Sequence, residues 1–216
     1  GFAALQGIGG LAVDAAGDLL VTELGNNLPA VRRISRTEPE VRSLAYVNGN
    51  SNLADVVVDR NGNYYVSAGS AVEKVSADGT VSRFAGTGAE GNADGPGAEA
   101  QFGFATGLAI DANGNVYVAD NNNHSVRKIA PDGTVSTLAG TGVAGFADGP
   151  AASAQFARPE SVAVDASGNV YVSDGGNAGN CRLRKITPDG NVTTLAGGEG
   201  CTGVDGVGAA AGFGFP

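Results

Sequence analysis

The feature that most constrains the fold is a segment that occurs four times in the 216 residues of the chain. Its clearest copy is IDANGNVYVADNNNHSVRKI (110–129), and the next is VDASGNVYVSDGGNAGNCRLRKI (164–186). Weaker copies lie at 13–34 and 58–75, and all four align on an aspartate: Asp14, Asp59, Asp111 and Asp165. These aspartates are 45, 52 and 54 residues apart, a period that predicts a solenoid or a propeller.

Each copy contains four short stretches with the alternation of a β-strand. In the third copy they are 107–111, 115–120, 125–130 and 134–140, separated by Asn113-Gly114, a polar loop and a Pro-Asp-Gly turn at 131–133. Both faces of these strands carry Val, Ile, Leu or Tyr, as expected for a sheet packed between two neighbours. The sequence therefore predicts an all-β chain, a β-propeller of four-stranded antiparallel blades. We expect one array over 1–216, with repeats at about 7–52, 53–106, 107–160 and 161–216.

The strings GLAIDANGNVYVADNNNHSVRKIAPDGTVSTLAGTG and GFADGPAASAQFARPESVAVDASGNVYVSD resemble NHL repeats, in particular the bacterial type with a glycine-rich connector between blades. The resemblance is strong in the last three repeats and weak in the first. There RTEPE (36–40) replaces the PDGT turn, and the long connector is missing. The family implies a propeller, commonly of six blades, whereas four repeats are present. Three alternatives follow: the array continues in a larger propeller, four blades close into a ring, or separate chains complete one.

Net charge and hydropathy exclude some classes of partner. The chain has a formal net charge of −9 at pH 7, which disfavours binding to nucleic acid or to anionic lipid. No apolar run approaches the roughly 20 residues of a membrane-spanning helix. We therefore expect protein partners, including other copies of the chain, with no nucleic acid and no membrane insertion.

The repeated aspartates have two interpretations. Asp14, Asp59, Asp111 and Asp165 could form a ring of carboxylates around the propeller axis and hold a cation. Alternatively, each accepts hydrogen bonds from its own turn, together with the turn glycine three residues later: Gly17, Gly62, Gly114 and Gly168. Because every copy carries that glycine, the sequence favours the structural role.

The glycine-rich connectors at 88–102, 142–156 and 198–213 place an aspartate at equivalent positions: Asp94, Asp148 and Asp205. Ca²⁺ requires six to eight oxygen ligands, and one carboxylate per loop supplies few of them. The favoured interpretation is a capping role, with Phe102, Phe156 and Phe213 between the blades. We thus expect no metal and no cofactor, with Ca²⁺ as the less favoured alternative.

The third strand of each repeat carries a pair such as Arg127-Lys128 or Arg184-Lys185. Adjacent strand residues point to opposite faces, so these pairs cannot form one cationic patch. We expect them to pair with acidic neighbours such as Asp120 and Asp174.

The residues predict no catalytic group. Family relatives include lyases that use clustered histidines, but this chain has one histidine, His124, in a polar loop. Cys181 and Cys201 lack the CxxC spacing of a zinc site, and SAGSA (67–71) is not a nucleophile elbow.

Cys181 and Cys201 fall at the same open end of the hairpin formed by the third and fourth strands of the last repeat, within reach of a disulfide. Such a bond indicates an oxidising compartment, so we expect a secreted protein, with two free thiols as the alternative. The chain contains no methionine, which indicates a processed product or a segment of one. Asn123 and Asn191 fit the N-glycosylation pattern.

Two hypotheses for function follow. The first is a non-catalytic, extracellular or cell-surface bacterial propeller that serves binding or self-assembly, as a scaffold, filament or surface layer. The second is an enzyme of the lyase or lactonase type, with its active centre in the axial channel, completed by blades that are not present here.

Overall fold

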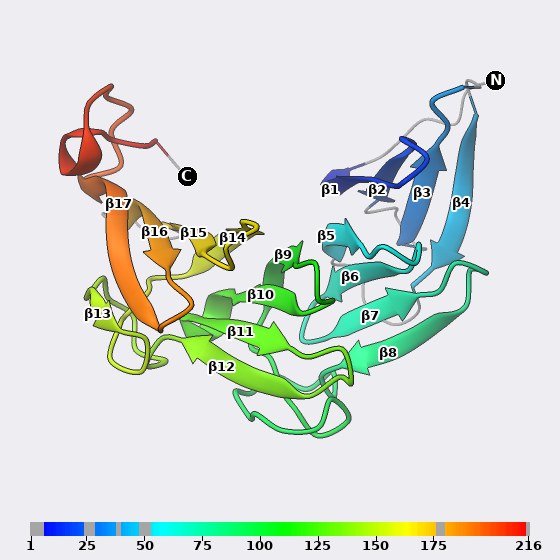
Figure 1. The fold of residues 1–216 in the computed structure, drawn as a ribbon, viewed down its shortest axis with the longest axis horizontal. Coiled ribbons are helices and arrows are strands. Elements are labelled where there is room, and N and C mark those ends of the chain that lie inside the picture. The colour runs from blue at the N-terminus through cyan, green and yellow to red at the C-terminus, as the bar shows by residue number, and fades with distance from the viewer. Residues whose placement is uncertain (1–6, 24–28, 38–39, 48–52, 176–179, 215–216) are drawn as a thin grey trace.

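The computed structural model describes residues 7–23, 29–37, 40–47, 53–175 and 180–214. These residues form four antiparallel sheets, or blades, that stand side by side in an arc (Figure 1). Blade 1 contains β1 (Ile8–Val13), β2 (Leu19–Glu23), β3 (Ala30–Ile34) and β4 (Val41–Tyr46). Blade 2 contains β5 (Leu53–Val58), β6 (Tyr64–Ala68), β7 (Val72–Val75) and β8 (Val81–Ala85).

Blade 3 contains β9 (Ala105–Ile110), β10 (Val116–Asp120), β11 (Ser125–Ile129) and β12 (Val135–Ala139). Blade 4 contains β14 (Pro159–Val164), β15 (Val170–Asp174), β16 (Asn180–Ile186) and β17 (Asn191–Glu199), with the short β13 (Gly149–Pro150) added at the edge of β17. Two 3₁₀ turns, η1 (Asn121–Asn123) and η2 (Gly208–Ala210), complete the elements. The predicted all-β fold with four-stranded blades is confirmed. None of the helices in the described part of the chain has the length and apolar character needed to span a bilayer.

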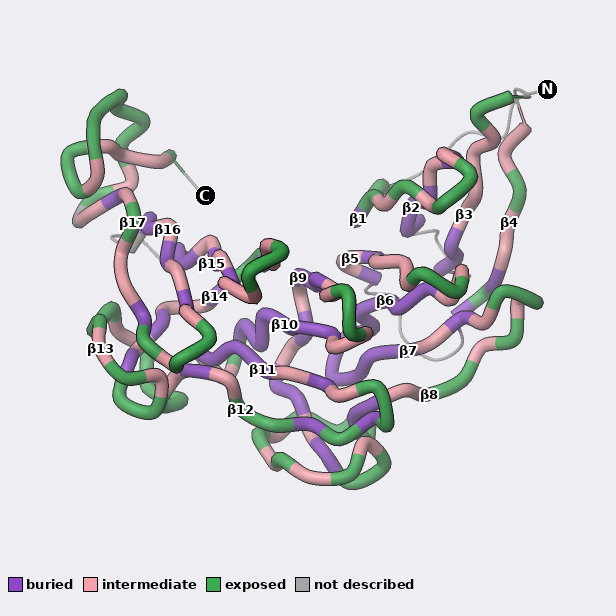
Figure 2. Tube along the Cα trace, in the orientation of Figure 1, coloured by how far each residue is buried: buried purple, intermediate pink, exposed green. Residues whose placement is uncertain are grey.

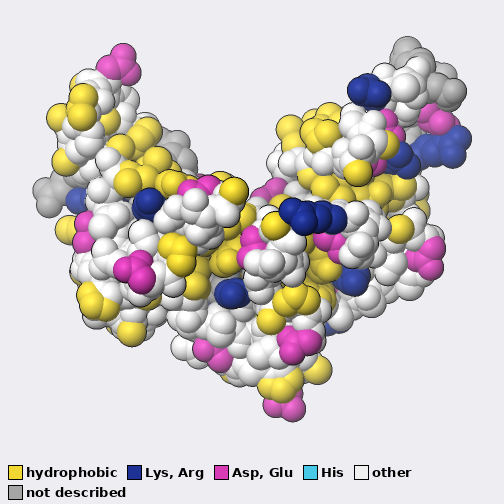
Figure 3. Space-filling model, viewed as in Figure 1, with side chains coloured by type: hydrophobic (Ala, Val, Ile, Leu, Met, Phe, Trp, Pro, Cys, Tyr) yellow, Lys and Arg dark blue, Asp and Glu magenta, His cyan; other side chains and the backbone are white. Residues whose placement is uncertain are grey.

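The arc is open. Figure 1 shows blades 1 and 4 standing apart at its two ends, and the space-filling view shows the hollow between these arms (Figure 3). On β1, Ile8, Leu11 and Val13 are each more than half exposed, at 52%, 58% and 62%. The four blades therefore do not close into a ring (Figure 1), which was one of the three arrangements compatible with the sequence.

The hydrophobic core lies between the blades. Three separate clusters of buried side chains fill the three spaces between neighbouring sheets, as the buried middle strands in Figure 2 indicate. Representative members are Leu20, Leu53 and Val66 between blades 1 and 2, Val72, Phe102 and Leu108 between blades 2 and 3, and Val126, Phe156 and Val172 between blades 3 and 4. Each inner blade is thus buried on both faces, which explains why its strands are apolar on both.

The repeated aspartates shape the first hairpin of each blade. In blade 4, Asp165 Oδ1 accepts hydrogen bonds from the backbone N–H groups of Ser167 and Asn169, each at 2.9 Å. Its Oδ2 accepts from the Asn169 amide at 2.7 Å and from the Tyr171 hydroxyl at 3.0 Å. Asp59 and Asp111 make the same bonds, and the turn glycines have a positive φ near 80°. These carboxylates are engaged in their own turns, and they do not converge on the axis.

A buried arginine holds the first connector against blade 3. Arg127 is 1% exposed, and its Nη1 donates to Asp120 at 3.0 Å and to the carbonyl of Gln101 at 2.9 Å. Its Nη2 donates to the carbonyl of Ala93 at 3.0 Å and to the carboxylate of Asp94 at 2.5 Å. We call this arrangement of an arginine between a strand aspartate and a connector aspartate a clamp.

Other contacts complete the clamp. Asp94 also accepts hydrogen bonds from the backbone N–H and the hydroxyl of Thr137 on β12, at 3.0 and 3.2 Å. The Phe102 ring lies against the Arg127 guanidinium, with 5.2 Å between the guanidinium carbon and the ring centroid. Such a contact stabilises a cation that has little access to water.

Blade 4 repeats the clamp with its own residues. Arg184, fully buried, donates to Asp174 at 2.9 Å and to Asp148 at 2.7 Å, and Asp148 accepts from Thr194 of β17. The predicted pairing of these arginines with Asp120 and Asp174 is therefore observed. Two of the three connector aspartates that we considered for Ca²⁺, Asp94 and Asp148, use their oxygens to bind these arginines.

We expect the clamp aspartates to contribute measurably to stability. Asp94→Asn or Asp148→Asn should lower the free energy of unfolding by about 1.5–3 kcal/mol, because each change weakens hydrogen bonds to a buried guanidinium. Asp205→Asn is the matched control, since Asp205 is exposed and no clamp arginine faces it in the described residues. It should change stability by less than about 0.5 kcal/mol in urea unfolding. Equal effects of the three changes would contradict this role.

The turn aspartates should make the fold sensitive to acid. The hydrogen bond from the Asn169 amide, with those from the Asn169 N–H and the Tyr171 hydroxyl, lowers the pKa of Asp165 to about 2 despite some desolvation. A lowered pKa stabilises the fold above the unfolded value of about 3.9, and this contribution disappears as pH falls through about 2. The difference in unfolding free energy between wild type and Asp165→Asn should therefore be constant above about pH 5 and shrink towards pH 2. A difference that does not depend on pH would refute this assignment.

Candidate functional site

A pocket of about 780 Å³ lies on the inner side of the arc. The first strands of all four blades line it with Gly9, Gly10, Ala54, Asp55, Thr106, Gly107, Glu160 and Ser161. These residues occupy two consecutive positions of the repeat, four and five residues before the turn aspartate. Phe104, Asn121, Arg158 and Ser173 complete the lining. The pocket is thus formed by equivalent positions of the four repeats, where each repeat carries a different pair of residues.

Irregular pairing at these positions exposes polar groups to the pocket. The register between first and second strands shifts between Ile8 and Leu11, between Leu53 and Val56, and between Pro159 and Ser161. Bulges of this kind redirect backbone and side chains, and they are common next to functional sites.

Hydroxyl oxygens on the second strands accept hydrogen bonds from backbone N–H groups of the first strands at these irregular positions. Thr22 Oγ1 accepts from Gly10, Ser67 Oγ accepts from Asp55, and Ser173 Oγ accepts from Ser161, at 2.6, 2.8 and 3.1 Å. A small polar residue on the second strand therefore keeps the floor of the pocket in place.

Glycine permits the blades to approach each other closely here. A Cβ at Gly10 would lie 2.5 Å from the Cα of Asp55, and a Cβ at Gly107 would lie 2.6 Å from the Cα of Ser161. Any larger residue at either position would push two first strands apart and change the shape of the pocket.

Asp55 is the carboxylate of the pocket that joins two blades. Its Oδ1 accepts from the N–H of Val56 at 2.8 Å, and its Oδ2 accepts from the N–H of Leu108 in blade 3 at 2.9 Å. Burial raises the pKa of Asp55, although both hydrogen bonds act in the opposite direction. Both oxygens serve the blade interface, yet the group remains at the pocket wall.

Arg158 is the cationic group of the pocket. Its Nε donates to Asn121 Oδ1 at 3.0 Å, and its Nη2 lies 3.5 Å from Asn122 Oδ1. No carboxylate lies within ion-pair distance of Arg158 in the described ranges, in contrast to Arg127 and Arg184. Neutral amide oxygens therefore orient this guanidinium without neutralising it.

The backbone at Arg158 is strained. Its φ of 61° and the φ of 50° at His124 are the two positive values for non-glycine residues in the part of the chain that the structure describes. The two residues are bonded to each other, because the N–H of Arg158 donates to His124 Nδ1 at 3.1 Å. His124 thus supports the loop that carries Arg158. Strained residues of this kind are frequent at functional sites.

The other predicted site residues lie elsewhere. Asp205 is exposed in the third connector. Asn123 is half-buried, and its Nδ2, the atom to which a glycan would be attached, donates to Gly91 and Asp120 at 2.7 and 2.8 Å. Asn191 is exposed at the start of β17. Within the described ranges, no three His, Cys, Asp or Glu side chains gather as ligands of one metal ion.

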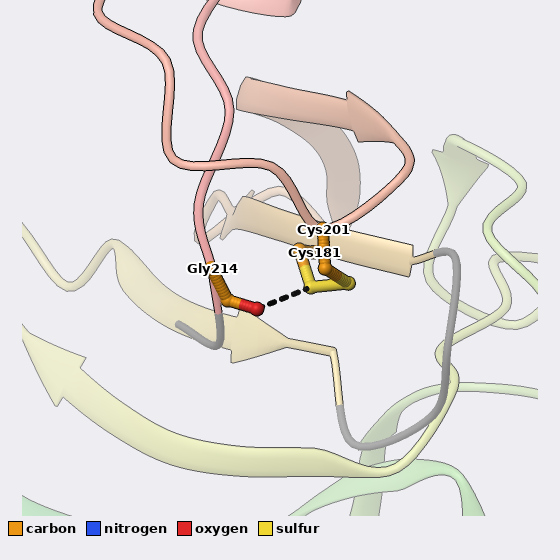
Figure 4. Close-up of a disulfide and its surroundings, with 3 residues drawn as sticks. All are labelled: Cys181, Cys201 and Gly214. Atoms are coloured by element: carbon orange, nitrogen blue, oxygen red, sulfur yellow. Dashed lines mark hydrogen bonds between the residues drawn. A yellow bond between two sulfur atoms is a disulfide. The ribbon is translucent and has the colours of Figure 1, made fainter.

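Cys181 and Cys201 form a disulfide, with 5.2 Å between their Cα atoms (Figure 4). The bond ties the third connector to β16, and the carbonyl oxygen of Gly214 lies 3.7 Å from Cys181 Sγ. Clamps hold the first two connectors, whereas a covalent bond holds the third.

Sequence reasoning missed Asp55 and Arg158. Both lie before the turn aspartate, at positions where the other repeats carry different residues, so a search for shared residues does not select them. The available signal was a charged residue at a strand position that is glycine in other copies, such as Gly10 and Gly107.

Part of the chain matches a known repeat and a known protein in sequence. Residues 102–129 and 156–186, in blades 3 and 4, match the NHL repeat. The Arabidopsis thaliana protein SUPPRESSOR OF QUENCHING 1, chloroplastic, is 38% identical over 89 residues, which are 41% of this chain and 8% of that protein.

Solved structures share the blade arrangement. An auxiliary nutrient binding protein from Bacteroides ovatus ATCC 8483 superposes with a TM-score of 0.73 at 17% identity, covering 98% of this chain and 53% of its own. Virginiamycin B lyase from Staphylococcus aureus gives 0.61 at 13% identity, covering 88% and 55%. The chain thus spans about half the length of these two solved structures. The chain thus carries NHL repeats in blades 3 and 4 and has the blade arrangement of a β-propeller.

Proposed function

We propose that this chain is a non-catalytic, extracellular binding propeller whose axial pocket takes a small polar ligand with an acid group. The observation that carries the proposal is Arg158, a half-buried guanidinium at the pocket that is oriented by Asn121 and paired with no carboxylate in the described residues.

Arg158 is suited to bind an anion. A guanidinium presents five N–H donors in a fixed plane, and hydrogen bonds to two asparagine oxygens use one donor on Nε and one on Nη2. The remaining donors match the two oxygens of a carboxylate. A bound anion would also compensate the partial desolvation of this cation.

The rest of the lining favours a ligand with several hydroxyl groups. Glu160 offers acceptors, Ser161 offers a hydroxyl, and Phe104 offers an apolar surface. A ligand with an acid group at one end and hydroxyls along its length fits this distribution, as a sugar acid does. Pockets of about 300–1,000 Å³ are typical of small-molecule sites. Two of the structural neighbours are auxiliary nutrient binding proteins, which supports a binding role.

Catalysis is the second candidate function. The raised pKa of Asp55 favours it, because a carboxyl group with a raised pKa can transfer protons, and one neighbour is a lyase. Against it, both Asp55 oxygens are occupied by backbone N–H groups of two blades.

The extracellular location rests on the disulfide, which persists in oxidising compartments.

Self-assembly is a further part of the proposal, because apolar side chains are exposed at both ends of the arc: those of β1 at one end, and Val204 and Val207 at the other. Light scattering should show that mass increases with protein concentration. A constant monomer mass at all concentrations would remove self-assembly from the proposal.

The ligand class can be tested with a matched pair of sugars. D-glucuronate should bind at least about tenfold more tightly than D-glucose in titration calorimetry, because its carboxylate adds a charged hydrogen bond worth about 1.5–3 kcal/mol. Arg158→Met should remove this preference, whereas Arg60→Met, at an exposed turn, should keep it.

The outcomes separate the parts of the proposal. Equal binding of both sugars would refute the acid group but keep a sugar-binding pocket, whereas no binding of either would refute the ligand class. Recovery of altered sugar after incubation would support the enzyme.

A further inference from the structure

The two clamps define what a blade needs in order to hold a connector. The arginine of the third strand is paired across the sheet with a threonine of the fourth strand: Arg127 with Thr137, and Arg184 with Thr194. Both bind the connector aspartate. The glycine after that aspartate pairs with the free edge of the fourth strand, Gly95 with Val135 and Gly149 with Val192.

Blade 1 has the same three groups in the same register. Arg32 on β3 is paired across the sheet with Ser43 on β4, and Ile34 is paired with Val41, as Ile129 is with Val135. Ser43 supplies the same backbone N–H and hydroxyl as Thr137. Strand β4 is the last strand of its sheet, so among the described residues its outer edge has no strand partner.

Blade 2 lacks these groups and serves as an internal contrast. Its third strand carries Glu73 at the clamp position, and its fourth strand carries Arg83 directly opposite. The two side chains pair with each other at 2.6 Å. Arg83 therefore neutralises Glu73 within blade 2 itself. The carboxylate of Glu73 would repel the aspartate of a connector.

Arg32 is positioned to accept a connector. Its Nε donates to Glu23, which stands in the place of Asp120, at 2.5 Å. Neither Nη group makes a hydrogen bond to the described residues, whereas in Arg127 and Arg184 the Nη groups hold the connector. The Arg32 side chain is 21% exposed, against 1% for Arg127 under its connector.

We propose that blade 1 binds an extended, glycine-rich peptide of the connector type, in which an Asp-Gly pair lies eight residues before a phenylalanine. The Asp carboxylate would bind Arg32 and Ser43, and the following glycine would pair with β4 at Val41. Recognition is therefore by strand addition to an open edge, with the arginine selecting the acid.

The third connector shows that such a segment keeps its shape without a clamp. Asp205 lies eight residues before Phe213, the spacing of Asp94 to Phe102 and of Asp148 to Phe156. The N–H of Gly212 donates to the carbonyl of Val204 at 2.8 Å, as Gln101 does to Ala93 and Gln155 to Ala147, each at 3.0 Å. A connector-type segment is thus able to present its aspartate before it meets an arginine.

The test uses the intact protein and a fluorescein-labelled peptide with the sequence of residues 142–157, GVAGFADGPAASAQFA. In fluorescence anisotropy it should bind the wild type. Replacing its aspartate, the equivalent of Asp148→Asn, should weaken binding at least about tenfold, because a charged hydrogen bond is lost. This comparison leaves the protein unchanged, so it does not depend on the folding of a variant.

Two protein variants locate the site. Arg32→Met should weaken binding of the original peptide at least about tenfold. Arg42→Met, at the preceding residue of β4 and on the opposite face from Ser43, should leave binding within about twofold. No binding up to about 1 mM peptide, where the binding free energy is only about −4 kcal/mol, would overturn the proposal. Equal binding of the Asp and Asn peptides, or no effect of Arg32→Met, would overturn it as well.

Discussion

A buried guanidinium between two carboxylates holds each of the first two connectors to the blade that follows it. Desolvation of an arginine is costly, and Arg127 and Arg184 are tolerated because each has a buried strand aspartate on one side and a connector aspartate on the other. The same strand aspartates also accept hydrogen bonds from backbone N–H groups beside the pocket. Asp120 accepts from the N–H of Phe104, and Asp174 accepts from the N–H of Ala157, next to Arg158. The clamp therefore fixes the connector and, through one more hydrogen bond, the residues that enter the pocket.

The blades depart from one another in ways that follow from the clamp. Blades 3 and 4, which receive long connectors, carry Arg with Thr. Blade 2, which receives none in the described residues, carries Glu73 with Arg83 and satisfies its own charge. The third connector has a disulfide where the other two have an arginine. In blade 2 an ion pair within the sheet takes the place of the pair between arginine and connector. In the third connector a disulfide takes the place of the arginine.

Much of the fold could be predicted from the sequence because the turns state their geometry locally. Asp111 and Gly114 specify a hairpin through hydrogen bonds within a few residues. The same residue types at the equivalent positions of the other repeats form the same hairpin. The pairing of Arg127 with Asp120 followed from strand alternation. The pocket did not follow, because it depends on contacts between blades, such as Asp55 with Leu108, and on a positive φ at Arg158 that is not encoded by a turn residue. The open arc depends on how the sheets curve, which repeat counting does not give.

The strain at the joint between blades 3 and 4 connects stability with the site. A positive φ at a residue other than glycine costs on the order of 1–3 kcal/mol. His124 and Arg158 both have a positive φ, and a hydrogen bond joins them. Asp174, which pairs with Arg184 in the blade 4 clamp, also accepts from the N–H of Ala157 and so joins the clamp to the loop that carries Arg158. Relaxation of Arg158 to a negative φ would turn its side chain away from Asn121 and remove the positive charge from the pocket. The buried ion pair of blade 4 is therefore bonded to the same loop that holds Arg158 at a positive φ.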